Sequence, residues 1–537
     1  MRVPGGGVPG SQGNLGGVKK TRRLVPLALL VTALAVAPGC TVTGDGPLKT
    51  REPAATTSSA PAREFDPTAG TAPELERFYT QTVDWAECGP DTECGFVQVP
   101  MDYDVPDGVT ITIAVNRLKT AGSGAPDLFL NPGGPGGSGT GMLEWIKFSV
   151  SDRLSSEYNL VGFDPRGVNQ SDAVDCITDT ELDAWRAQDV DTSTDAGLAA
   201  YAAEMEVYGK RCAENTGELL GHLDTDNAAR DLDVLRAVVG RTDTLDYLGY
   251  SYGTFLGAVY ADLFTERVGR FTLDGAIDPA LSISGLGLGQ AAGFENALRT
   301  YMADCQSSAD CPFAGSVDDG LAQVRQLLDV VRATPLPTDD PNRPLTYPLA
   351  LSGIILPMYE SSIWPQLSLA LDSAINDNDG TELLYWADLG AGRQEDGTYD
   401  DNSNEAFMAI NCLDYPVEGT LADWRADAAK MTQVSPTLRD ALAYTEITCD
   451  AWPYDSVRTR GPIAAAGSAP ILVVGTTGDP ATPYQWAVSM ADELEQGHLL
   501  TWEGNGHTAY GRSNQCVTDA VDEYMITGAL PEDGATC

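Results

Sequence analysis

Gly249-Tyr250-Ser251-Tyr252-Gly253 is the stretch of sequence that decides the fold. It follows an apolar run at 245–248 and precedes a helix-like segment at 255–264. A G-x-S-x-G motif between a strand and a helix is typical of a nucleophile elbow, a sharp turn that exposes a serine at the carboxyl end of a strand. The glycines have a steric function, because a strained turn leaves no room for side chains two positions from the serine. We therefore expect Ser251 to be a nucleophile.

A glycine-rich loop after an earlier strand supports this hypothesis. Residues 131–139 read Asn-Pro-Gly-Gly-Pro-Gly-Gly-Ser-Gly and follow the apolar run 128–130. A loop without side chains can point backbone N–H groups into a cavity, where they stabilise the oxyanion that forms when a serine attacks a carbonyl. The expected donors are the N–H groups of Gly134 and of Tyr252, the residue after the nucleophile. The alternative is a flexible turn, which would not need so many glycines.

Two polar residues follow later strand-like runs. Asp479 comes after 471–475, and His507 comes after 498–502. The chain order Ser251, Asp479, His507 is the order of a catalytic triad in the sheet architecture to which G-x-S-x-G belongs. In such a triad His507 takes the proton of Ser251 and later gives it to the leaving group, while Asp479 holds the imidazole in one tautomer.

Histidine scarcity sharpens this interpretation. The chain has 3 histidines. His222 lies upstream of the elbow in a polar stretch, and His498 begins a strand. Only His507 stands in a glycine-rich loop after the last strand. For Asp479 the alternative is a turn-forming aspartate before proline, which is a common role.

Together these motifs resemble the α/β-hydrolase peptidases, in particular the secreted tripeptidyl aminopeptidases of actinobacteria, which are relatives of the proline iminopeptidases. The resemblance covers about residues 75–537 and includes the segment 411–414. In proline iminopeptidases the oxyanion loop begins with His, where this chain has Pro132. The glycines and Pro135 of the loop are present, so we expect the oxyanion hole to be intact. The resemblance also implies that Arg166 braces loops near the site. The motifs that carry it are Pro-Gly-Gly-Pro-Gly (132–136), Gly-Phe-Asp-Pro-Arg-Gly (162–167), Gly-Tyr-Ser-Tyr-Gly-Thr (249–254), Gly-Asp-Pro-Ala-Thr-Pro (478–483) and Gly-Asn-Gly-His-Thr (504–508).

The predicted fold class is α/β, of the α/β-hydrolase type. Strands that alternate with helices predict a mainly parallel sheet flanked by helices. The strand pattern stops after residue 277 and returns near 465, which predicts a mostly helical cap inserted before the strand that carries Asp479. The expected regions are a signal peptide (1–39), a disordered Thr/Ser/Pro linker (40–73), the first part of the core (74–277), the helical cap (278–465) and the C-terminal part of the core (466–537).

A cap over an aminopeptidase site has to bind the ammonium group of the substrate, most simply with carboxylates. Glu360 and Asp414 are the candidates in the predicted cap. The alternative for each is a solvated or structural carboxylate, which is the commoner role.

Charge and the N-terminus bear on partners and compartment. The formal net charge is −44, which repels nucleic acid and excludes it as a partner. Basic residues at 19–23 precede an apolar run at 24–37 and then Pro38-Gly39-Cys40, the pattern of a signal peptide. Cys40 after Gly39 indicates a lipoprotein signal with Cys40 lipidated. Plain secretion is the alternative, because Ala37 stands where such signals carry leucine.

Setting Cys40 aside leaves ten of the 11 cysteines, and an even number in an exported chain indicates disulfides. No C-x-x-C pair exists and histidines are few, so we expect no zinc or other metal. Sequence does not fix the connectivity. Because short loops close most easily, the favoured pairing is sequential: Cys88–Cys94, Cys176–Cys212, Cys305–Cys311, Cys412–Cys449 and Cys516–Cys537.

These observations predict an exported serine exopeptidase that hydrolyses peptides from their free N-terminus through an acyl-enzyme, as a tripeptidyl or prolyl aminopeptidase does. We expect a monomer that needs no cofactor and touches the membrane only through a lipid anchor, on the outer face of the cell or beyond it. One alternative is a carboxylesterase or lipase-like hydrolase of acyl esters, since a triad and an oxyanion hole serve esters equally well. The other is a non-catalytic binding lipoprotein on a hydrolase scaffold.

Overall fold

The computed structural model describes residues 65–309 and 311–537. The predicted signal peptide, Cys40 and most of the predicted linker lie outside the described residues. Within the described ranges, no helix combines the length and the apolar character needed to cross a membrane.

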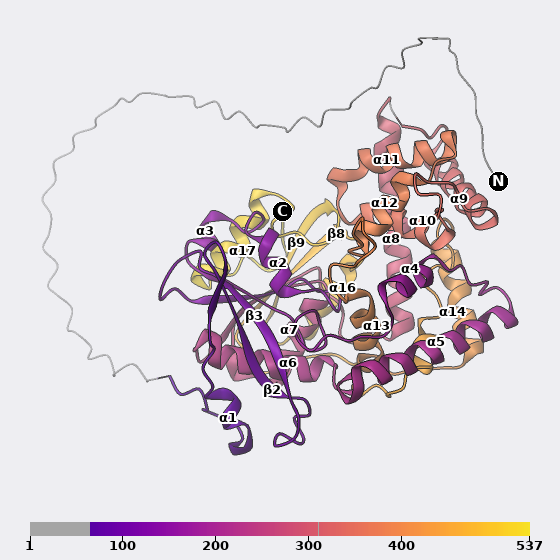
Figure 1. Cartoon of the computed structure of the whole chain (residues 1–537). Coiled ribbons are helices and arrows are strands. Elements are labelled where there is room, and N and C mark those ends of the chain that lie inside the picture. The colour runs from indigo at the N-terminus through magenta and orange to yellow at the C-terminus, as the bar shows by residue number, and fades with distance from the viewer. Residues whose placement is uncertain (1–64, 310) are drawn as a thin grey trace, which may run out of the picture. The chain divides into compact units, whose positions relative to one another are not determined.

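A ten-stranded sheet organises the described chain (Figure 1). Its first strands pair antiparallel, and from β5 onward all neighbours are parallel. The spatial order is β1-β2-β3-β5-β4-β6-β7-β8-β9-β10. The strands are β1 (Ala86–Gly89), β2 (Thr92–Pro100), β3 (Thr110–Leu118), β4 (Asp127–Asn131), β5 (Asn159–Phe163), β6 (Leu245–Tyr250), β7 (Val268–Asp274), β8 (Ile471–Gly478), β9 (Gly497–Asn505) and β10 (Ala535–Thr536).

Both faces of the central strands are buried, which explains their continuous apolar runs. In β4, Phe129 packs into one core, whereas Leu128 and Leu130 pack into the core on the other face. The first face is covered by α6 (Thr225–Leu235), α7 (Tyr252–Leu263) and α16 (Tyr484–Glu493); the second is covered by α2 (Gly139–Ile146), α3 (Asp152–Ser155) and α17 (Gln515–Thr527).

Between β7 and β8 the described chain forms helices and no named strand. Several of these helices share a separate apolar core around Leu298, Leu328 and Leu371, and Figure 1 shows α9–α12 gathered beside the sheet. The prediction of an α/β-hydrolase sheet with a mostly helical cap is therefore confirmed. The cap helices are α8 (Ile283–Ser307), α9 (Val317–Ala333), α10 (Tyr347–Ile355), α11 (Trp364–Asp372), α12 (Thr381–Gly390), α13 (Ser403–Asp414), α14 (Leu421–Val434) and α15 (Thr445–Asp450).

An excursion between β5 and β6 also joins the cap, which the sequence did not reveal. It contains α4 (Asp179–Ala187) and the long α5 (Asp195–Thr216). Contacts link α4 to α10 and α5 to α15. A short helix, α1 (Glu76–Tyr79), precedes the sheet.

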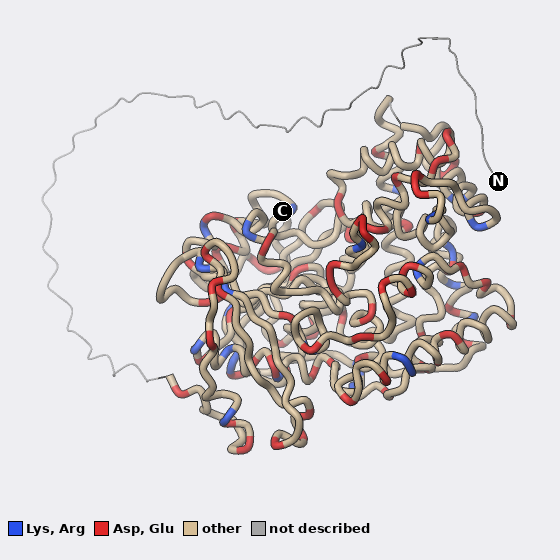
Figure 2. Tube along the Cα trace, viewed as in Figure 1, with Lys and Arg blue, Asp and Glu red and all other residues tan. Residues whose placement is uncertain are grey.

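The ten described cysteines form five disulfides in the sequential pairing; the pairs are Cys88–Cys94, Cys176–Cys212, Cys305–Cys311, Cys412–Cys449 and Cys516–Cys537. Acidic residues are spread over sheet and cap and outnumber basic ones (Figure 2).

Candidate active site

Ser251 occupies a strained turn between β6 and α7. Its backbone has φ 55° and ψ −122°, a conformation that costs a non-glycine residue about 1–3 kcal/mol. The flanking glycines are required by close packing. A Cβ on Gly249 would lie 2.5 Å from the carbonyl oxygen of Gly253, and one on Gly253 would lie 2.9 Å from the carbonyl oxygen of Asn131. The elbow geometry therefore follows from the two glycines.

The glycine-rich loop packs directly against this elbow. A Cβ on Gly133 would lie 2.5 Å from the carbonyl oxygen of Tyr250 and 3.0 Å from the backbone nitrogen of Tyr252. Among the described residues, no protein acceptor takes a hydrogen bond from the N–H of Gly134 or from that of Tyr252, which begins α7. Both donors are therefore free for a ligand. Asp164 anchors the end of the loop by accepting from Ser138 Oγ at 2.7 Å.

A carboxylate and an imidazole meet beside the elbow. Nδ1 of His507 lies 2.9 Å from both Oδ1 and Oδ2 of Asp479. Asp479 is 4% exposed, and it also accepts hydrogen bonds from the N–H groups of Ala481, Thr482 and Thr508. Since an ionised carboxylate only accepts, this contact assigns the proton to Nδ1 and leaves Nε2 as the free base.

Ser251 and His507 line one cavity of about 270 Å³. Within the described residues the serine hydroxyl donates no hydrogen bond to the imidazole. Hydroxyl–imidazole contacts are often loose without substrate and tighten when it binds. The structure thus brings together the three residues that the sequence placed far apart, with the histidine–aspartate contact formed.

Two residues that support His507 were missed by sequence reasoning. Asp274, at the end of β7, is buried and accepts hydrogen bonds from the N–H groups of Ala509 at 2.9 Å and Tyr510 at 2.7 Å. Burial raises the pKa of the Asp274 carboxyl to about 6. Tyr359, in the cap, accepts a hydrogen bond from the His507 N–H. A carboxylate at the end of a parallel strand next to the elbow strand was the available signal for Asp274.

Arg166 connects the end of β2 to α6 and lines neither cavity. It is fully buried and binds both oxygens of Asp231 at 2.7 Å. It also donates to the carbonyl oxygens of Met101 and His222. This agrees with the bracing role that the family resemblance implies.

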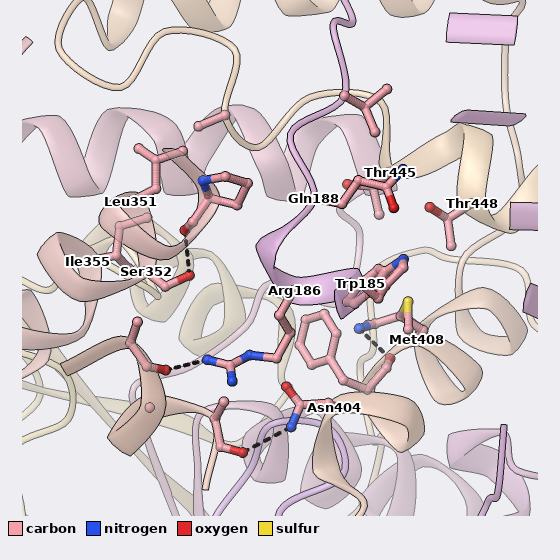
Figure 3. A pocket seen from close by; sticks show the side chains of 18 of the residues that line it. Trp185, Arg186, Gln188, Leu351, Ser352, Ile355, Asn404, Met408, Thr445 and Thr448 are labelled. Atoms are coloured by element: carbon pink, nitrogen blue, oxygen red, sulfur yellow. Dashed lines mark hydrogen bonds between the residues drawn. The ribbon is translucent and has the colours of Figure 1, made fainter. Parts of the chain in front are cut away.

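A second, larger cavity of about 880 Å³ lies under the cap. It shares Gly134 and Tyr359 with the smaller cavity. Figure 3 shows side chains of α4, α10, α13 and α15 around it, including Trp185, Leu351 and Met408. The larger cavity therefore begins at the oxyanion loop and extends between the cap and the excursion after β5.

The charges in the larger cavity leave a surplus of carboxylates. Arg332 is paired with Asp189, and Arg186 is bound to Asp388 and to the cap backbone. Among the described residues, the Glu204 carboxylate accepts a side-chain hydrogen bond only from the Gln188 amide, at 2.9 Å. Burial raises the pKa of the Glu204 carboxyl above its ordinary value, and that amide opposes the shift. Asp440 also lines this cavity and, among the described residues, forms no ion pair.

The structure does not place the two predicted amine ligands in either cavity. Asp414 is 1% exposed, and both its oxygens accept hydrogen bonds from Thr225. Glu360 caps a short 3-10 helix by accepting from Ser362 N–H, and its backbone pairs with Gly506. Asp414 is therefore part of a buried hydrogen-bond network, whereas the carboxylates that line the larger cavity without an ion pair are Glu204 and Asp440.

Comparison with known proteins gives the family. A family model described as alpha/beta hydrolase fold matches residues 126–348, and one described as TAP-like protein matches residues 435–537. Serine protease Hip1 of Mycobacterium tuberculosis is 36% identical over 494 residues, which cover 87% of this chain and 93% of that protein.

Two further relatives are similar over most of their length. Carboxylesterase B of Mycobacterium tuberculosis is 36% identical over 454 residues, or 83% of this chain and 86% of that protein. Tripeptidyl aminopeptidase of Streptomyces lividans is 31% identical over 486 residues, or 87% of this chain and 89% of that protein. The chain therefore belongs to the α/β-hydrolase family, among the actinobacterial serine peptidases.

Proposed function

We propose that this protein is an exported serine exopeptidase that releases short peptides from the N-terminus of its substrates. Ser251 attacks the scissile carbonyl while His507 Nε2 accepts the hydroxyl proton. The N–H groups of Gly134 and Tyr252 bind the oxyanion. His507 then protonates the leaving amine, the acyl-enzyme remains on Ser251, and water releases it by the same steps in reverse.

One observation carries the proposal. His507, held by the buried Asp479, lines the same cavity as a serine in an elbow conformation, beside two backbone donors that have no acceptor among the described residues. Structural carboxylate–imidazole pairs occur elsewhere in proteins, but the combination with a strained serine and free N–H groups is what acyl transfer requires.

The preference for peptides with a free amine rests on the larger cavity. Its volume of about 880 Å³ falls within the range of sites that enclose a sizeable ligand. The acyl portion of a peptide of a few residues would lie there, and Glu204 and Asp440 would meet its ammonium group. The names of the serine protease and tripeptidyl aminopeptidase relatives support the same assignment.

Export is proposed on two grounds. Five disulfides are typical of chains that mature in an oxidising compartment, and the sequence at 19–40 has the pattern of a lipoprotein signal. We propose that Cys40 carries the lipid and that the catalytic part stands outside the cell. Mass spectrometry of the mature N-terminus tests this: an unmodified N-terminus other than Cys40 would contradict the anchor.

The experiment for the reaction uses a fluorophosphonate probe and a peptide mixture. The wild-type protein is expected to be labelled and Ser251→Ala is expected to be unlabelled, whereas the control Ser156→Ala, at an exposed serine, is labelled normally. Mass spectrometry of products then identifies the bond cleaved. Release of N-terminal fragments, blocked by N-acetylation of the substrate, supports the exopeptidase.

An ester-hydrolase function is the second candidate, because carboxylesterase B is 36% identical to this chain over 454 residues, and serine protease Hip1 is 36% identical over 494. Turnover of simple alkyl esters, with no cleavage of any free-amine peptide, would favour it over the peptidase. Absence of probe labelling in the folded protein would contradict both.

A further inference from the structure

The two cavities at the proposed active site differ in size and charge. The cavity at Ser251, about 270 Å³, has roughly a third of the volume of the one under the cap. Its lining includes His507 and one arginine, Arg512, and no carboxylate. The larger cavity instead carries the carboxylates Glu204 and Asp440 without an arginine partner among the described residues.

Proton transfer assigns the leaving group to the smaller cavity. The leaving amine takes its proton from His507, so it has to lie beside that ring. The smaller cavity is lined by His507 and by the residues that follow it in the same loop, Thr508, Tyr510 and Arg512. The larger cavity is lined by the oxyanion loop and the cap, without His507. The acyl part of a peptide therefore belongs under the cap and the leaving part beside Arg512.

Arg512 is an unpaired cation in a strongly acidic chain. The protein has 77 acidic and 33 basic residues, yet the Arg512 guanidinium forms no ion pair or hydrogen bond with any described residue. It is exposed where it lines the cavity.

The loop that carries Arg512 is nonetheless held in place. The Arg512 N–H donates to the carbonyl oxygen of Ala509 at 3.1 Å, and Asp274 fixes Ala509 in turn. A Cβ on Gly511 would lie 2.8 Å from the carbonyl oxygen of Ser149, so the loop packs closely against Ser149, another residue that lines the cavity. The backbone from which the Arg512 side chain extends is therefore fixed.

We propose that Arg512 binds the C-terminal carboxylate of the substrate, and that the preferred substrates are short peptides with a leaving group of one or two residues. The proposal rests on the peptidase function argued above. A peptide of this class has its ammonium group toward Glu204 and Asp440 and its carboxylate toward Arg512, so its charges match the two ends of the site. A guanidinium suits this role because it can bind both oxygens of a carboxylate.

The test compares peptides that differ only at the C-terminus. Starting from the sequence cleaved best in the product analysis, leaving groups of one to six residues are made as free acids and as carboxamides, and kcat/KM is measured for each. For the wild type, the free acid is expected to be favoured about fivefold to tenfold at leaving groups of one or two residues. The ratio falls to about one for long leaving groups, whose carboxylate lies beyond the guanidinium.

Arg512→Gln is expected to bring the acid-to-amide ratio to about one at every length, while Arg512→Lys retains part of it because the charge remains. The matched control is Arg241→Gln, which removes another exposed arginine, at the end of the segment before β6 and away from both cavities. This control keeps the wild-type ratio. Raising the salt concentration to about 1 M lowers the ratio in the wild type, because screening shortens the reach of the charge.

The outcomes separate this inference from the function on which it rests. Peptides cleaved from the N-terminus with equal rates for acid and amide, or an acid preference that survives in Arg512→Gln, would overturn the role of Arg512 and leave the exopeptidase standing. Turnover of esters with no cleavage of any free-amine peptide would overturn both.

Discussion

The carbonyl oxygen of Tyr359 accepts a hydrogen bond of 2.9 Å from the N–H of His507, and the tyrosine ring meets the imidazole edge-on with centroids 5.2 Å apart. Tyr359 ends a 3-10 helix of the cap at Leu356–Tyr359 and lines both cavities. The cap is thereby connected directly to the proposed base, so a displacement of the cap would reach the reacting groups.

Tyr359→Ala is expected to lower kcat/KM by about tenfold to a hundredfold for peptides and esters alike, because the imidazole loses one wall and small misplacements of a catalytic group are costly. Tyr359→Phe keeps the ring and is expected to retain most of the activity, since the phenol hydroxyl bonds to no described residue. Steady-state kinetics, with circular dichroism to check folding, measure both. Activity of Tyr359→Ala within twofold of the wild type would show that the contact does not orient the base.

Asp479→Asn tests the role of the buried carboxylate. The amide can donate to Nδ1 and so favour the wrong imidazole tautomer, and kcat is expected to fall by about 10³ to 10⁴ with little change in KM. Asp492→Asn, which alters an exposed aspartate on α16, is the control and is expected to behave as the wild type. A loss in Asp479→Asn smaller than about tenfold would argue for a different orienting group.

The sequence predicted those residues of the candidate site whose positions are set by strong local constraints. Because Ser251 has a φ of 55° and its flanking glycines have no room for a Cβ, the G-x-S-x-G motif can be recognised from the sequence alone. The aspartate and the histidine follow β8 and β9, and the carboxyl ends of neighbouring parallel strands meet at one edge of the sheet. Chain order and strand order together were therefore sufficient to bring Ser251, Asp479 and His507 into one neighbourhood.

The carboxylates of the proposed substrate site could not be predicted from the sequence in this way. Asp414 belongs to a recognisable segment, yet its neighbour in space is Thr225, which is 189 residues away in the chain. Glu204 lies on α5, in a part of the chain assigned to the core, and reaches the cavity only because this helix packs against α15. Which carboxylate faces a cavity depends on such long-range packing, which composition and periodicity do not encode.

Asp414 instead forms a buried chain of contacts behind the elbow. Its carboxylate accepts from Thr225 N–H at 2.8 Å and from Thr225 Oγ1 at 2.6 Å, and Thr225 Oγ1 contacts the hydroxyl of Tyr252 at 2.5 Å. Burial raises the pKa of Asp414 to about 7, and the hydrogen bonds from Thr225 oppose that shift. Between about pH 4 and pH 7 the folded state holds a proton that the unfolded chain has lost.

Stability is therefore expected to fall as pH rises through that window and to level off above about pH 7, by roughly 4 kcal/mol at most from this group. Asp414→Asn removes the titration, so its melting temperature is expected to decline less than that of the wild type between pH 5 and pH 8. Thermal melts at matched ionic strength measure the two slopes. Identical slopes would mean that Asp414 is ionised in the folded protein throughout the range.

The disulfide between Cys412 and Cys449 connects α13 to α15, and both cysteines line the larger cavity. Because it closes a loop with a sequence separation of 37, replacing both cysteines by alanine is expected to cost about 3–4 kcal/mol of stability. The wall of the larger cavity also becomes less rigid, so KM for peptides is expected to rise severalfold while turnover of small esters changes less.

The control removes Cys516–Cys537, whose separation of 21 predicts a similar loss of stability, but which lies away from both cavities. That variant is expected to melt earlier with an unchanged KM, measured well below its melting temperature. Equal rises of KM in the two variants would show that general loosening, and not the cavity wall, controls how peptides bind.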